Sequence, residues 1–253
     1  MYTAKTRSSN KKKAVLITAL AACLVLAVGG GVLAWFSAQD SVTNTFVQGN
    51  GIKEPETKPD PSDPEQGGGG NVGPADGYII EDKWVDSSSI MPDSIVPKNP
   101  NVGIDNDSTA AYVFVEVENN LGAGSYFILN KNWKPVSGKC TEYLAGGQGA
   151  YESGLFVYIG TNPAGDAASA GDIGAMKLLE PAANATKDVY TGEVFSKVYT
   201  THNFQLSEAK TMNVKSFLAG ASNDEEDLTS WETKTEIYNK AIQWMTSNNS
   251  DPI

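Results

Sequence analysis

Residues 111–118 read Ala-Tyr-Val-Phe-Val-Glu-Val-Glu, which is the clearest β-strand pattern in the chain. Successive side chains of a strand point to opposite faces, so Val113, Val115 and Val117 share one face. Tyr112 and Phe114 share the other face with the two glutamates. The valine face is the better candidate for packing against the core.

Further short strand patterns, separated by turn residues, lie on both sides of this stretch. They occupy residues 42–48, 78–80, 84–85, 126–129, 155–160, 194–199, 203–206 and 212–218. Short strands at this spacing indicate antiparallel sheets and not a fold of alternating strands and helices. The sequence therefore predicts a mainly β fold, an antiparallel β-sandwich or jelly roll, over residues 78–247.

One helix is expected near the C-terminus. Thr229 and Glu232 form a capping-box pattern. Trp231, Tyr238, Ile242 and Met245 then follow at helical spacing. Residues 248–253 are polar and are predicted to be a frayed tail.

Residues 53–77 differ from the rest in composition, with five prolines and four consecutive glycines. A segment with so few apolar residues buries too little surface to offset its chain entropy. We interpret it as a disordered linker or loop between an N-terminal segment, residues 35–52, and the body. If the strand at residues 42–48 belongs to the same domain, the segment is a long loop within one fold. If it does not, the segment tethers a separate arm.

The first 34 residues have the pattern of a secretory signal. Residues 11–13 are three lysines, residues 14–36 carry no charge, and residues 29–31 are three glycines. This order predicts a signal peptide over residues 1–34 with cleavage near Ala34 or Ala38. Two alternatives stay open: residues 14–36 are long enough to be a retained membrane anchor, and Cys23 stands in a lipobox-like Leu-Ala-Ala-Cys and would then be lipidated.

Several features follow one another at the N-terminus: the lysines, the apolar run, the triple glycine, Ala34-Trp35-Phe36, and Asn44-Thr45-Phe46 with Gly49. This order resembles the export signal of the TasA/camelysin family. These are exported and biofilm-matrix proteins of Gram-positive bacteria, processed by a SipW-type signal peptidase. The resemblance covers residues 1–50, and in the body Pro97 and Asn101 before the strand at residues 111–118 are also similar. It implies a β-sandwich or jelly-roll fold, export, and that peptidase as a partner.

Charge and cysteine content exclude some functions. Residues 1–34 hold five of the 19 basic residues and no acidic ones, so the remainder carries 14 basic against 30 acidic residues, a balance of −16. Such a surface repels nucleic acid and anionic lipid. Removal of the leader would leave Cys140 as the single thiol, so we expect stability without disulfides.

The candidate chemical sites are weak. Some camelysin-type members are classed as metalloproteases. In this sequence His202 is the single histidine and no His-Glu-x-x-His motif is present. We therefore expect that the protein is not an enzyme. A Ser-His-Asp triad or a pairing of Cys140 with His202 has no motif to support it. The acidic loops offer four weak calcium candidates, with solvated turns as the alternative: Asp105, Asp107, Asp224 and Glu226. We expect no other cofactor.

The sequence thus predicts an exported, non-enzymatic structural protein of the cell surface or biofilm matrix. The strand at residues 42–48 and the segment after it suggest assembly into fibres by strand donation to a neighbouring molecule. The other hypothesis is a monomeric surface binding module held at the membrane by residues 14–36. Self-association, or binding to other matrix or surface proteins, is expected in the first case.

Overall fold

The computed structural model describes residues 39–45, 47–48, 77–85, 88–106, 108–143, 148–208, 210–220 and 227–248. All of them belong to the second of the two compact units into which the chain divides, residues 36–253. The predicted signal peptide, its cleavage positions and almost all of the predicted linker lie outside the described residues. Gly77, which we placed in the linker, is the first residue of a strand.

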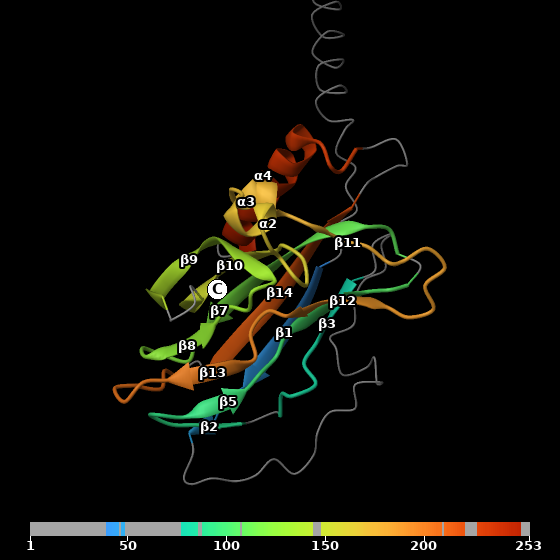
Figure 1. Ribbon diagram of the computed structural model, residues 1–253. Coiled ribbons are helices and arrows are strands. Elements are labelled where there is room, and N and C mark those ends of the chain that lie inside the picture. Colours follow the sequence, from blue (N-terminus) through green and yellow to red (C-terminus); the bar gives the residue numbers. More distant parts are fainter. Residues whose placement is uncertain are drawn as a thin grey trace, which may run out of the picture. The chain divides into compact units, whose positions relative to one another are not determined.

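A large antiparallel sheet forms the main layer (Figure 1). Its strand order is β1–β14–β7–β10–β8–β13–β5, with β11 pairing to β7 and β9 to β10. The strands are β1 Gln39–Thr45, β14 Thr211–Gly220, β7 Ala111–Asn119, β10 Gly149–Tyr158, β8 Ser125–Ile128, β13 Lys197–Thr200, β5 Ile95–Pro97, β11 Leu178–Leu179 and β9 Trp133–Tyr143.

A smaller antiparallel sheet has the order β12–β6–β3, with β12 at Val189–Glu193, β6 at Asn101–Ile104 and β3 at Gly77–Ile80. Apolar side chains of the two sheets share one buried cluster, which includes Ile79 and Val102 of the small sheet and Val115 and Val214 of the large one. The predicted mainly β fold, with antiparallel sheets and one C-terminal helix, is confirmed. A short parallel pair, β2 Val47–Gln48 with β4 Ser89–Ile90, completes the strands that the structure describes.

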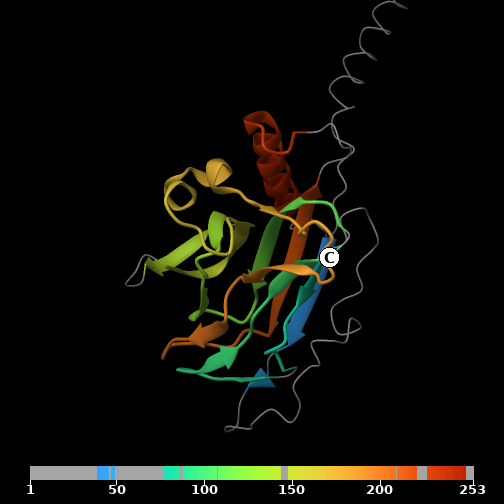
Figure 2. The ribbon, with the colours of Figure 1, turned by 45° about the vertical axis from the view of Figure 1, so that its right-hand side comes forward.

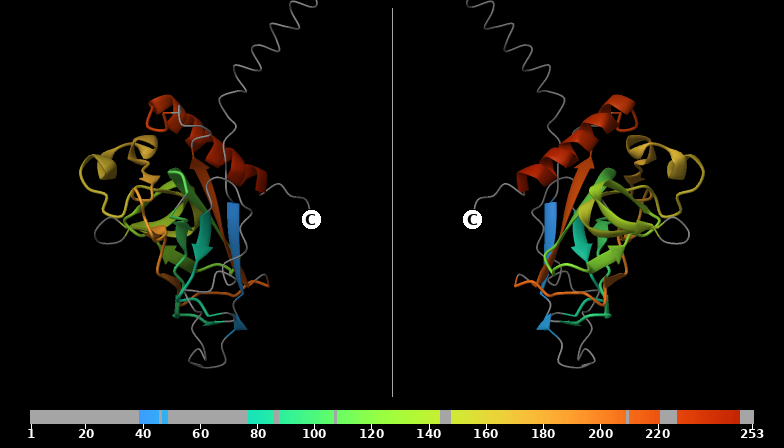
Figure 3. Two further views of the ribbon diagram at one scale, coloured as in Figure 1. Left: turned by 90° about the vertical axis from the view of Figure 1, so that its right-hand side faces the viewer. Right: turned by 90° about the vertical axis from the view of Figure 1, so that its left-hand side faces the viewer.

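Strand β7 is buried on both faces. Its valine face lies in the core as predicted, but Tyr112 and Phe114 on the other face are also fully buried, and Glu116 is 2% exposed. The second face is buried because the C-terminal helix α4, Trp231–Asn248, packs against the sheet (Figure 3). The second face is therefore apolar and covered by the helix at Tyr112 and Phe114, and polar further along the strand at Glu116 and Glu118.

Helix α4 is present as predicted, but its cap and buried stripe differ from the prediction. Ser230 Oγ accepts the hydrogen bond of the Thr233 N–H at 3.2 Å, so Ser230 and not Thr229 caps the helix. The buried residues are Ile237, Ala241 and Trp244, whereas Trp231 is 63% exposed. Of the residues noted at helical spacing, Tyr238, Ile242 and Met245 are half-buried and only Trp231 is exposed. Trp244, which was not among them, stacks on the ring of Phe217.

Several other boundaries differ from the expected ones. Residues 84–85 and 203–206 are not strands. The 11-residue strand β9 was not predicted, nor were β12 and the four-residue helices α2 (Asp166–Ser169) and α3 (Asp172–Ala175). The predicted strands at residues 78–80, 111–118, 126–129 and 212–218 are confirmed within one or two residues at each end. The strand at residues 155–160 is also present, but begins six residues earlier.

Candidate functional site

The N-terminal strand β1 forms an edge of the large sheet. It pairs antiparallel with β14 along its whole length, from Gln39 opposite Phe217 to Thr45 opposite Thr211. Figure 2 shows β1, in blue, beside β14 on the outside of the sheet. The sequence left open whether this segment is a separate arm, and the structure makes it a strand of the same sheet.

One apolar side chain anchors β1 to the core. Val42 lies opposite Val214 of β14, which in turn lies opposite Val117 of β7, and Val42 packs against the core cluster. Ser41 and Thr43, on the other face of β1, are exposed. Because side chains alternate along a strand, a slip of one residue would move Val42 out of the core, so this valine fixes the register.

A row of polar side chains lies on the opposite face of the same three strands. Lys215 of β14 pairs with Glu118 of β7 at 2.9 Å and lies 3.9 Å from Glu116. Asn213 donates to Glu118 Oε2 at 3.2 Å. Lys215 is opposite Ser41, and Asn213 is opposite Thr43. The seam with β1 therefore has an apolar side and a charged, hydrogen-bonded side, which together specify how a strand can lie on β14.

The other end of the strand order is formed by β5. This strand has three residues and ends at Pro97, which has no N–H to donate. Ile95 is 59% exposed. A short strand with a proline is a poor template for an added strand, so the β14 edge is the better acceptor.

One of the four calcium candidates lies in the described part of the chain. Asp105 is half-buried, and the other three candidates, Asp107, Asp224 and Glu226, lie outside the described residues. Asn106, next in the chain, donates to Asp188 Oδ1 from its backbone N–H at 3.1 Å and from its side chain at 3.2 Å. Among the described residues no group of three or more His, Cys, Asp or Glu could hold a metal ion.

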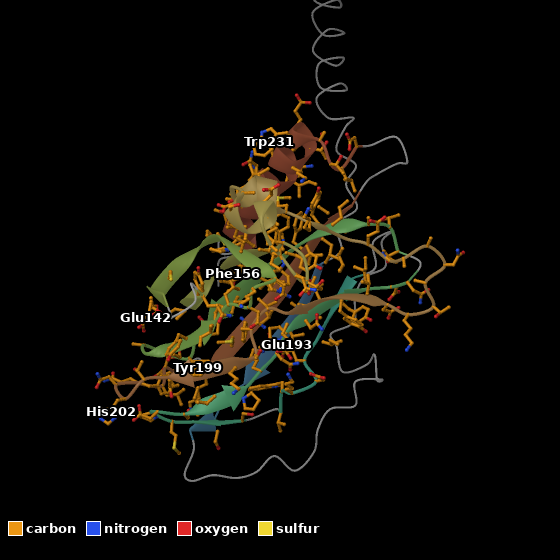
Figure 4. The ribbon with its side chains drawn as sticks, viewed as in Figure 1. Glu142, Phe156, Glu193, Tyr199, His202 and Trp231 are labelled. Atoms are coloured by element: carbon orange, nitrogen blue, oxygen red, sulfur yellow. The ribbon has the colours of Figure 1, made fainter. Side chains whose placement is uncertain are left out.

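His202 lies in the turn after β13, and its side chain points outward (Figure 4). Its Nδ1 is 2.8 Å from Asp93 Oδ2, and the two side chains are 86% and 61% exposed. The Cys140 thiol has a different partner, the Glu142 carbonyl oxygen at 3.3 Å. The structure thus shows an exposed His–Asp pair, without a serine or cysteine bonded to it in the described part of the chain.

A buried ion pair was missed by the sequence reading. Lys98 Nζ lies 2.5 Å from Glu81 Oε1, and the two side chains are 0% and 5% exposed. The Trp84 ring lies 5.3 Å from the same ammonium group. Burial lowers the pKa of Lys98, and the Glu81 carboxylate opposes this shift. The loop Glu81-Asp82-Lys83 gave no pattern that could predict the pair, since its partner is 17 residues away.

A second polar cluster lies next to this pair, around Glu193 (Figure 4). Its carboxylate accepts hydrogen bonds from Lys83 Nζ, from Asn99 Nδ2 at 3.2 Å and from Ser196 Oγ at 2.5 Å. Burial alone would raise the pKa of Glu193, but the bonds from Lys83 and Ser196 outweigh it and hold the pKa below its ordinary value. Both clusters connect loops around the small sheet, which is a structural role.

Comparisons of the chain with protein-family models, with curated proteins and with solved structures find no match. Within the described residues, no helix combines the length and the apolar character needed to cross a membrane. The geometry of the chain itself identifies the seam between β1 and β14 as the candidate functional site.

Proposed function

We propose that this chain is an exported, non-enzymatic structural protein of the cell surface or biofilm matrix, and that it assembles into fibres by donating its N-terminal strand. The observation that carries the proposal is the position of β1 as an edge strand, which is hydrogen-bonded to β14 on one side and also contacts β3 of the small sheet. Its main-chain hydrogen bonds and one valine contact are interactions that an identical strand of a neighbouring molecule can make equally well.

The length of chain after this strand permits such an exchange. Between Gln48 and Gly77 lie the 28 residues 49–76. Covalent geometry limits their span to about 90 Å when fully extended, well beyond the distance needed to reach an adjacent molecule. The composition of this segment, rich in proline and glycine, does not oppose an extended path.

The geometry of donation determines the shape of the product. Each molecule would give β1 to one neighbour and accept β1 from another, which is a head-to-tail contact between different surfaces. Contacts of this kind form open filaments unless the rotation closes a ring. Because the same residue pairs form within and between molecules, a high protein concentration is expected to favour the filament, as in domain swapping.

The resemblance of the leader to TasA/camelysin export signals supplies the cellular setting. In this proposal a SipW-type signal peptidase cleaves near Ala34 or Ala38, which leaves β1 close to a new N-terminus. A terminal strand can leave one seam and enter another without threading a loop, whereas a strand held at both ends cannot. Main-chain pairing requires no cofactor, and no catalytic step is part of the proposal.

The test is the N-terminal residue of the protein from the culture medium and from the membrane fraction, measured by mass spectrometry, with electron microscopy of the same samples. We expect a start between Trp35 and Asp40 in the medium, together with filaments. An intact leader confined to the membrane fraction, without filaments, would contradict the proposal and favour a tethered monomeric binding module.

A further inference from the structure

The outer face of strands β8, β13 and β5 carries a row of apolar side chains. Tyr199 of β13 lies opposite Tyr126 of β8 on one side and opposite Ile95 of β5 on the other. Directly opposed residues share a face of the sheet, so these three side chains stand in one row. The residues that alternate with them are buried in the core: Val96, Phe127 and Val198.

This row faces away from the core, where the sheet would be expected to be polar. Ile95 is 59% exposed, and the two tyrosines are half-buried (Tyr199 is labelled in Figure 4). In the next row of the same face, exposed Pro97 lies opposite exposed Lys197. An apolar face of this kind is a candidate for contact with a ligand or another segment. We call Tyr126, Tyr199, Ile95, Pro97 and Lys197 together the tyrosine face.

The two rings determine which ligands suit the tyrosine face. Their centroids are 5.4 Å apart and their planes differ by 14°, so each ring covers one side of the other and leaves one side for a further contact. Tyrosine offers such a contact an apolar ring and a polar tip. Aromatic rings beside aliphatic side chains form the kind of surface that binds proline-rich segments in the polyproline II conformation.

The chain itself contains such a segment. Residues 55–64 read Pro-Glu-Thr-Lys-Pro-Asp-Pro-Ser-Asp-Pro. Pro61 and Pro64 are three residues apart, which is one turn of a polyproline II helix and about 9 Å. Three neighbouring strands at about 4.8 Å spacing extend over about 10 Å. These two prolines would therefore lie on one side of the segment and reach across the three strands.

The described ends of the chain lie where such a contact requires them. Strand β2 ends at Gln48 and pairs with β4, which in turn contacts β5, and Figure 1 shows β2 close to β5. Twelve residues, 49–60, separate Gln48 from Pro61, and twelve more, 65–76, separate Pro64 from Gly77. Each of these stretches can span about 40 Å. The chain length thus permits Pro61 and Pro64 to reach the tyrosine face of their own molecule.

Charge also favours this segment over another copy of the chain. Residues 55–64 have three acidic residues and one basic residue, a balance of −2. Lys197 lies on the β5 side of the tyrosine face, whereas Glu142 is near Tyr126, where it adds to the rise in the tyrosine pKa that burial and Tyr199 cause. An acidic segment is therefore favoured toward Lys197. A second body, with its balance of −16, would bring far more negative charge.

We propose that the tyrosine face binds the proline-rich segment of its own chain, with Pro61 and Pro64 against Tyr199 and Ile95. The contact forms within one molecule and does not require strand donation. One consequence does rest on the proposed function: a bound segment shortens the tether behind the donated strand, so its release should speed up filament formation.

The test is electron paramagnetic resonance of the full chain in phosphatidylcholine nanodiscs, with a nitroxide label at Ser62→Cys and with Cys23→Ala and Cys140→Ala. At low protein concentration we expect a spectrum with a motionally restricted component. Pro61→Ala together with Pro64→Ala should lower the ratio of bound to unbound segment by about tenfold, because the ring contacts and the preformed conformation are lost.

A pair of surface variants locates the contact. Ile95→Asp should lower the same ratio by about fivefold or more, because it places a negative charge within the tyrosine face. Trp231→Asp is the matched control, since Trp231 on α4 is 63% exposed and Ile95 is 59% exposed. The control should leave the spectrum unchanged.

Three results would overturn the proposal. One is a freely rotating label in the original chain. Another is a restricted label that Ile95→Asp does not release, in a protein whose thermal unfolding matches that of the original chain. The third is a restricted component that grows with protein concentration, because it would identify a second copy as the occupant. A restricted label in samples that form no filaments would count against strand donation and not against this contact.

Discussion

At the scale of single residues, the ion pair of Lys98 with Glu81 illustrates how burial changes the contribution of a charged group to stability. Both side chains are removed from water, and Trp84 covers the ammonium group. The free energy gained by pairing two buried charges barely exceeds the cost of desolvating them, but removal of one partner leaves the other uncompensated. The pair is therefore expected to be intolerant of single changes and tolerant of joint replacement.

We predict that Lys98→Met lowers the free energy of unfolding by about 3–5 kcal/mol, because the Glu81 carboxylate loses its buried counter-charge. The double variant Lys98→Met with Glu81→Leu should recover most of this loss. Urea unfolding followed by tryptophan fluorescence measures both. A single variant as stable as the original chain would show that the pair is hydrated in solution.

The lowered pKa of Glu193 leads to a prediction about how the stability of the protein depends on pH. Its pKa in the folded protein is held below the ordinary value of 4.5 by hydrogen bonds from Lys83 and Ser196. A carboxyl group with a lowered folded pKa contributes stability above its unfolded pKa and loses it as the pH falls through the folded pKa. We expect Glu193→Gln to be less stable than the original chain at pH 7, with a difference that shrinks below about pH 4.5.

Thermal unfolding of both proteins between pH 7 and pH 3 measures this difference. Glu208→Gln, an exposed carboxylate for comparison, should change little across the range. A constant difference between Glu193→Gln and the original chain at all pH values would mean that the effect is one of packing and not of ionisation.

At the scale of elements, helix α4 converts a half-exposed sheet into a buried one. Trp244 is 8% exposed and stacks on Phe217 at 5.4 Å, while Phe217 contacts Phe114 of β7 at 6.0 Å. The Tyr112 hydroxyl donates to the Leu228 carbonyl at 2.8 Å, just before the helix begins. These contacts attach the helix through aromatic side chains of one sheet face.

We predict that Trp244→Ala destabilises the protein by about 3–5 kcal/mol, as expected for truncation of a buried aromatic side chain. Trp231→Ala on the same helix should cost less than about 0.5 kcal/mol because its side chain is exposed. Chemical denaturation of the two variants provides the comparison. Equal losses for both would contradict the observed orientation of the helix.

The elements also show how far the sequence alone could lead. The strand at residues 111–118 and the strand at residues 212–218 were found because β-branched and aromatic residues alternate there. Strand β9 was missed because Lys134, Pro135 and Gly138 break this pattern, and such residues are tolerated where a strand has a neighbour on one side. The buried face of α4 could not be predicted from the sequence, because Trp231 and Trp244 are equally apolar. Tertiary packing determines which of the two is buried.

The candidate site was predictable only in part. The short strand and the segment rich in proline and glycine are visible in the sequence, and they suggested a strand able to pair with a sheet edge. The partner strand was not visible, because β14 is separated from β1 by more than 160 residues.

At the scale of the whole molecule, assembly by strand donation depends on which copy of β1 occupies the edge of β14. Within one chain, Thr43 and Asn213 are opposite each other across this seam. Thr43 is exposed and its neighbour Val42 supplies the core contact, so a change at Thr43 leaves the anchor intact. A disulfide between cysteines at these two positions would record the identity of the donor strand.

The most direct measurement is therefore disulfide trapping with Thr43→Cys and Asn213→Cys in a chain that also carries Cys23→Ala and Cys140→Ala, with the two single cysteine variants as controls. When the protein is oxidised after assembly, we predict a ladder of disulfide-linked multimers on a non-reducing gel. When the protein is oxidised as a monomer, we predict a single band on the gel. This locked monomer should form no filaments until its disulfide bond is reduced. Filaments formed equally well by the locked monomer, or assembled protein that gives only the monomer band, would contradict strand donation.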